Sequence, residues 1–221
     1  MGTVAVVWAP ARVLRDTAAQ RRVLAGFVVT AVYATLSLAA SAAAVFGGVT
    51  RAQFEGQSTP PGLPPDLLEN IAVVTEVATL VFSVLAPFVW WIAVSLVMQL
   101  ATHFFGGSGP LSAMLAAVGV AGVPLALGSL VQALATGLQV ALGVESTAGV
   151  TVGLLGGLFT IAALVWHVVL VVIGAALARR IGYGESAGSC AVSCVGCLGL
   201  IILLAVVLAG IAVLLGAAAP Q

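Results

Sequence analysis

Five long stretches of the chain are almost entirely apolar, and the polar residues gather in the segments between them. A helix needs about 20 consecutive apolar residues to cross about 30 Å of hydrocarbon. The stretches lie at about 24–46, 79–105, 111–142, 150–178 and 189–217. The pattern therefore predicts five transmembrane helices. Because several stretches exceed 20 residues, it also predicts tilts, kinks or helix ends beyond the bilayer.

The segments between the predicted spans carry turn and loop chemistry. FGGSGP separates the second and third spans, and RRIGYGESAGS separates the fourth and fifth. The Pro-rich run QSTPPGLPPD predicts a rigid loop that leads into a helix start near Asp66. Pro87 and Pro124 lie inside predicted spans, where each removes a backbone donor, so we expect a kink at both.

Composition agrees with an integral membrane protein of the all-α class. The 221 residues are 62% hydrophobic and 6% charged, whereas soluble domains carry about 25% charged residues. The net charge of zero does not suit nucleic-acid binding, which requires a basic stripe. We therefore expect a polytopic helical bundle in a cell membrane, and no nucleic-acid partner.

The distribution of arginines predicts the orientation of the spans. With a cytoplasmic N-terminus, one arginine, Arg51, lies on the outer side and the other six lie on the inner side. The six are Arg12, Arg15, Arg21, Arg22, Arg179 and Arg180. Because short cytoplasmic loops are enriched in basic residues, the N-terminus is predicted to be cytoplasmic. The chain then divides into an N-terminal segment at 1–23 and a five-span domain at 24–218.

The segment VAVVWAPARVLRD precedes the first span. Pro10 suits the first turn of a helix, and Trp8 beside arginines suits the headgroup level of a membrane. We expect a short interfacial helix that anchors the N-terminus, with a partner-docking motif as the alternative. QRRVLAGFVV followed by ASAAA has features of a cleaved twin-arginine signal. Its apolar run is longer than a signal core and four more spans follow, so we interpret it as the first span.

All three cysteines lie in SCAVSCVGC, at the start of the fifth predicted span. On a helix they share one face, but Cys190 and Cys197 stand about 10.5 Å apart along the axis, too far to meet at one metal ion. Cys194 and Cys197 form a C-x-x-C at a helix start, a pattern that can be redox-active. We predict a small-residue packing face, with a thiol oxidoreductase site at Cys194 and Cys197 as an alternative.

Ionisable residues within spans are functional candidates, and His167 lies near the middle of the fourth span. It suits a proton relay or a polar pathway, and the simpler expectation is a neutral imidazole that is hydrogen-bonded to a neighbouring helix. The sequence contains no HExxH, no GxSxG and no phosphate loop. We therefore expect no enzyme activity, no cofactor and no metal.

The order of motifs resembles the Ypt-interacting-protein (Yip) domain family of five-span membrane proteins. WAPARVLRD, with Trp8 and Pro10, resembles the N-terminal lead-in of the family. LAPFVWWIAVSLVMQLATHFFGG resembles its second span, which ends in a Gly-rich inner turn, here Gly106 and Gly107. SGPLSAMLAAVGVAGVPLAL resembles its third span, and TIAALVWHVVLVVIG with GYGESAGSCAV resembles the connection from the fourth to the fifth.

The resemblance implies a five-helix fold with a cytoplasmic N-terminus, and, in eukaryotic relatives, trafficking roles with Rab-type GTPases. This chain has only about 23 residues before its first span and lacks the D-L-Y-G-P type motif of those relatives, so GTPase binding is doubtful. The compact form is similar to prokaryotic members, which implies a prokaryotic plasma membrane.

Three functional hypotheses follow from these observations. The first is a non-enzymatic membrane protein that acts through helix packing and through interaction with membrane lipids, a second copy of the chain or other membrane proteins. The Gly-rich run GVTVGLLGG at 149–157 supports it. The second is a small transporter or channel with a polar site near His167 and kinked spans at Pro87 and Pro124. The third is the thiol oxidoreductase.

Overall fold

The computed structural model describes residues 3–51 and 65–193, and within these ranges the chain is helical and contains no strand. Four segments are long and apolar enough to cross a membrane. They are Val23–Phe46, Glu69–Phe104, Leu111–Leu142 and Thr147–Arg179. The all-α class is thereby confirmed, and the four candidate spans overlap the first four that the sequence predicts. The predicted fifth span at 189–217 falls almost entirely outside the described residues.

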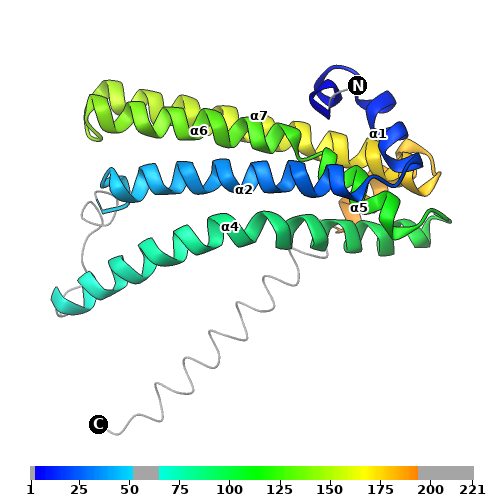
Figure 1. Cartoon of the computed structure of the whole chain (residues 1–221), viewed down its shortest axis with the longest axis horizontal. Coiled ribbons are helices and arrows are strands. Elements are labelled where there is room, and N and C mark those ends of the chain that lie inside the picture. The colour runs from blue at the N-terminus through cyan, green and yellow to red at the C-terminus, as the bar shows by residue number, and fades with distance from the viewer. Residues whose placement is uncertain (1–2, 52–64, 194–221) are drawn as a thin grey trace, which may run out of the picture.

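The helices follow one another with short connections (Figure 1). In chain order they are η1 (Thr3–Val7), α1 (Pro10–Ala19), α2 (Val23–Phe46), α4 (Pro65–Phe104), α5 (Leu111–Val120), α6 (Val123–Leu142) and α7 (Thr147–Arg179). Residues 183–193 form a further helix that reaches the limit of the described chain.

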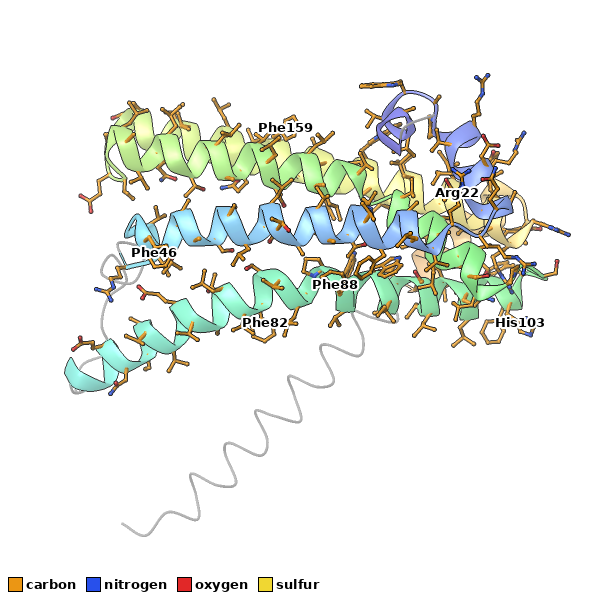
Figure 2. All side chains as sticks on the ribbon, in the orientation of Figure 1. Arg22, Phe46, Phe82, Phe88, His103 and Phe159 are labelled. Atoms are coloured by element: carbon orange, nitrogen blue, oxygen red, sulfur yellow. The ribbon has the colours of Figure 1, made fainter. Side chains whose placement is uncertain are left out.

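The long helices lie roughly side by side, and α1 lies across one end of them (Figure 1). α2 packs between α4 and α6, α6 packs along α7, and α5 contacts α1, α2, α4 and α7. Arg22 and His103 mark the end of the bundle that carries α1, and Phe46 marks the opposite end (Figure 2). These are called the α1 end and the Phe46 end below.

Helix α4 is longer than the sequence pattern predicts for the second span. Its 40 residues begin at Pro65, close to the helix start expected near Asp66, and continue without interruption into the span predicted from 79. At 1.5 Å per residue it is about 60 Å long, twice the thickness of the hydrocarbon core. Pro87 lies within the continuous helix, and Figure 1 shows α4 curving away from α2 toward its N-terminal end.

The third predicted span is two helices rather than one kinked helix. α5 ends at Val120 and α6 begins at Val123, so the chain breaks at Ala121 and Gly122 just before Pro124. Pro124 has no N–H to donate to the carbonyl of Val120 and instead occupies the first turn of α6, where no such donor is needed. The kink expected at Pro124 is therefore a complete helix break, located a few residues earlier.

The segment that contains this break is the centre of the bundle. Of its most apolar window, 61% is buried, against 17% for α4 and 22% for α2. Small side chains at 116–121 fill the interior together with the fully buried Met114. The outer helices turn large apolar side chains outward, such as Phe82 at 66% exposure and Phe159 at 45% (Figure 2). This arrangement suits a lipid environment, so the chain is a multi-pass membrane protein.

Candidate functional site

Arg179, the last residue of α7, is buried at the α1 end of the bundle, with 4% of its surface exposed. Its Nε donates to Oγ1 of Thr102 at 3.0 Å, and its two terminal nitrogens donate to the carbonyl oxygens of Gly107 and Gly109. In addition, the main-chain N–H of Ser108 donates to the carbonyl of Arg179 at 3.1 Å. One residue thus fastens the α4–α5 connection to the end of α7 through both its side chain and its main chain.

The glycines of this connection allow the close approach. A Cβ on Gly107 would lie 2.8 Å from the carbonyl oxygen of Thr102 and 3.0 Å from Nε of Arg179, and a Cβ on Gly109 would overlap the carbonyl oxygen of Ala178. Gly106 has a φ of +80°, a conformation that glycine adopts at no steric cost. The Gly106 and Gly107 that the sequence selects therefore lie in a tight turn beside Arg179, and Gly109 shares this role.

The sequence pattern does not predict the Arg179 cluster, because it indicates only an inner-loop charge at Arg179, alongside Arg180. Arg180 is indeed exposed. A clue was present in a loop of four small residues, GGSG, whose carbonyls are not shielded by side chains and need donors. Gln99 adds one, donating from Nε2 to the Gly109 carbonyl at 3.2 Å. Among the described residues Arg179 forms no salt bridge, so neutral oxygens alone hold this cation.

His167 lies within α7 and is also buried, at 4% exposure. Its Nδ1 lies 2.8 Å from the carbonyl oxygen of Ala121, which is the residue at the break between α5 and α6. A carbonyl can only accept, so Nδ1 carries the proton of the neutral ring and Nε2 has a free lone pair. The structure therefore confirms the expected hydrogen bond to a neighbouring helix, and that bond fixes the tautomer of the ring.

Two adjoining cavities lie beside His167. The inner one, about 20 Å³, is lined by His167, Thr30 and Tyr33 together with Gly122 of the helix break. The outer one, about 530 Å³, is an apolar groove lined by side chains of α2, α4, α6 and α7. Tyr33, Pro87, Trp90 and Leu125 line both. The sequence-selected Pro87 and His167 are thereby brought to the same place, which no spacing along the chain indicates.

A close crossing of α2 and α5 lies next to this site. A Cβ on Gly119 would overlap the Cα of Gly26, so the two backbones are in direct contact. Trp91 of α4 closes the same contact, because its indole N–H donates to the carbonyl of Leu115 at 2.8 Å. Pairs of small residues are a recognised way for membrane helices to approach closely.

The N-terminal candidates occupy the α1 end. Pro10 is the first residue of α1, as expected, and Trp8 just before it is 75% exposed. α1 buries Val13, Leu14, Thr17 and Ala18 against the bundle and leaves Arg12 and Arg15 exposed. The helix is therefore docked on the other helices through one face and presents a basic face outward.

The cysteine stretch is only partly covered by the structure. Cys190 is half-buried and packs against the apolar core, as a packing face predicts. Cys194 and Cys197 lie outside the described residues. Within the described part of the chain no cluster of His, Cys, Asp or Glu has a geometry suited to a metal ion.

Comparison with known proteins gives one match. A family model described as the Yip1 domain matches residues 4–208, nearly the whole chain, including α1 through α7. No curated protein and no solved structure matches the sequence.

Proposed function

The chain belongs to the Yip1 domain family, as its motifs predict, and on this basis we propose that it is a non-enzymatic membrane protein that acts through close helix packing and through contacts with lipids or partner proteins. The observation that carries the proposal is that buried polar side chains form hydrogen bonds between separate elements of the bundle. Those of Arg179, His167 and Trp91 each donate to the backbone of another element. They hold the helices together, and among residues 3–51 and 65–193 none is paired with a second group in a catalytic arrangement.

The proposal includes five spans and a cytoplasmic α1 end. Exposed arginines gather at this end, on α1, at the α1–α2 connection and at the end of α7. They are Arg12, Arg15, Arg21, Arg22 and Arg180. The connection between α6 and α7, at the Phe46 end, carries exposed Glu145 instead. This asymmetry supports the orientation through the enrichment of basic residues on the cytoplasmic side.

A single-cysteine labelling experiment tests the orientation. With the three native cysteines replaced by Ala, we expect Gly184→Cys to react with a membrane-impermeant thiol reagent only after cells are permeabilised, and Glu145→Cys to react in intact cells. Position 184 is suitable because it is exposed and a Cβ there meets no atom within 4 Å. Ser186, two residues on, is unsuitable because it is fully buried. The reverse labelling pattern would invert the proposed topology.

A flux measurement tests the proposed function itself. The purified full chain, reconstituted into liposomes, is expected to move protons, small ions and neutral solutes no faster than protein-free liposomes do. The reason is that the cavity at His167 is about 20 Å³, room for one water molecule. Flux that depends on the protein and is abolished by His167→Ala would contradict the proposal and favour the transporter hypothesis.

A further inference from the structure

The second ring nitrogen of His167 is an acceptor without a partner. Nδ1 is used by the Ala121 carbonyl, and Nε2 makes no hydrogen bond within the described part of the chain. The residue is 4% exposed, and its ring lines the 20 Å³ cavity. A ligand that donates a hydrogen bond to Nε2 from the cavity would give this acceptor a partner.

An apolar groove adjoins the inner cavity. The two share Tyr33, Pro87, Trp90 and Leu125 as lining residues. Its other lining residues are apolar, among them Phe82 and Leu164. Its volume of about 530 Å³ falls in the range of small-molecule sites. Several of its lining side chains, among them Phe82 and Val89, are exposed in the part of the chain that the structure describes.

The chemistry of the two cavities restricts what can bind. The inner cavity has room for about one polar atom with its hydrogens, and no Asp, Glu, Lys or Arg lines it, so a phosphate or an ammonium headgroup has neither space nor a counter-charge there. The atom to be satisfied is an acceptor, so the ligand must bring a donor. The groove requires an apolar body.

We propose that this site binds a membrane lipid whose polar head is a single uncharged hydroxyl group, with the hydroxyl donating to Nε2 of His167 and the apolar body lying in the groove beside Pro87 and Trp90. The proposal rests on the lipid-contact part of the proposed function and deepens it by naming the lipid class. A long-chain or isoprenoid alcohol and a diacylglycerol share this chemistry.

Quenching of tryptophan fluorescence measures the binding directly, because Trp90 lines the groove. The full chain in lipid nanodiscs is titrated with 9,10-dibromooctadecan-1-ol and, in parallel, with its methyl ether, which cannot donate a hydrogen bond. We expect saturable quenching by the alcohol and about tenfold weaker binding of the ether, since one hydrogen bond to a buried acceptor is worth about a factor of ten. Trp90→Phe is expected to remove the saturable signal, and Trp8→Phe, at the exposed N-terminus, to keep it.

Two variants separate the hydrogen bond from the groove. His167→Phe keeps an aromatic ring but has no acceptor, and it is expected to reduce the preference for alcohol over ether to about one. Because this change also removes the donor to Ala121, a second variant, Ala93→Phe, fills the groove from α4 without touching His167. It is expected to weaken the binding of both probes at least about tenfold, because the Phe side chain would occupy part of the groove volume that the probes fill.

The outcomes distinguish the lipid-binding proposal from the proposed non-enzymatic function. Competition by an isoprenoid alcohol or by a diacylglycerol identifies which class of lipid binds, and displacement of the brominated alcohol by either lipid supports the lipid-binding proposal. Equal quenching by alcohol and ether, quenching that does not saturate, or unchanged binding in Ala93→Phe would overturn it. Any of those results, with no flux in liposomes, leaves the non-enzymatic function standing. Flux in liposomes contradicts the wider function whatever the quenching shows.

Discussion

Replacement of Arg179 by Ala is expected to lower the free energy of unfolding by about 3 kcal/mol or more. The change removes three side-chain hydrogen bonds, to Thr102, Gly107 and Gly109. It leaves the buried Gly107 carbonyl without its side-chain donor, whereas the Gly109 carbonyl keeps the one from Gln99. Each buried group left unsatisfied costs about 1–3 kcal/mol. The measurement is the unfolding transition of the full chain in detergent, followed by circular dichroism as denaturant is added.

The neighbouring residue provides a matched control. Arg180 carries the same charge, is exposed, and has a φ of 58°, which asparagine tolerates well. Arg180→Asn is therefore expected to change the unfolding free energy by no more than about 0.5 kcal/mol. Arg179→Lys keeps the charge but has no planar fork to reach two carbonyls at once, so it is expected to restore only part of the loss. If Arg179→Ala and Arg180→Asn destabilise the chain equally, the hydrogen bonds of the Arg179 side chain contribute nothing specific to stability.

The contrast between these two arginines shows what the sequence can and cannot predict. Both lie at the same boundary, after an apolar run and before a Gly-rich loop, and a charge count treats them alike. Arg179 is buried because the α4–α5 connection, about 70 residues earlier in the chain, lies against the end of α7. Periodicity and composition are local, so they do not indicate which loop meets which helix end.

Local sequence signals agree with the structure where local interactions determine it. Helix α2 begins one residue before the predicted span and ends at the same residue, at Val23–Phe46 against 24–46. The agreement arises because the thickness of the bilayer and the flanking polar residues set both ends. Pro10 begins α1 because proline suits a first helical turn. α4 begins earlier than its apolar run, because helix formation needs no hydrophobic surroundings beyond the bilayer and its first turns carry polar residues such as Glu69 and Glu76.

The sequence predicts which residues belong to the candidate site, but not how they are arranged. His167 is a candidate as an ionisable residue in a span, and Pro87 as a helix-distorting residue. Their position beside the same inner cavity depends on how α4 crosses α2 and α7. The acceptor that fixes the ring, the Ala121 carbonyl, becomes available at a helix break, where the sequence predicts only a kink at Pro124. The free Nε2 follows from that packing alone.

Gly119→Ala is expected to have a comparably large effect, because it changes the crossing that holds this site in place. Its Cβ would overlap the backbone of Gly26 and come within 2.9 Å of the indole nitrogen of Trp91. Backbone atoms cannot rotate away as a flexible side chain can, so α2 and α5 must separate. We expect a loss of about 3 kcal/mol in the free energy of unfolding, at the upper end of the range for overpacked cores.

Gly137→Ala is the matched control, since a Cβ at this position of α6 meets no atom within 4 Å. Alanine is the better helix former, so this change is expected to stabilise the chain by about 0.5–1 kcal/mol. Separation of α2 from α5 also displaces Trp91 from the Leu115 carbonyl, to which it donates at 2.8 Å. Gly119→Ala should therefore shift the tryptophan emission of the folded protein, and Gly137→Ala should not. Equal stability of the two variants would mean that contact between Gly119 and Gly26 does not hold the bundle together.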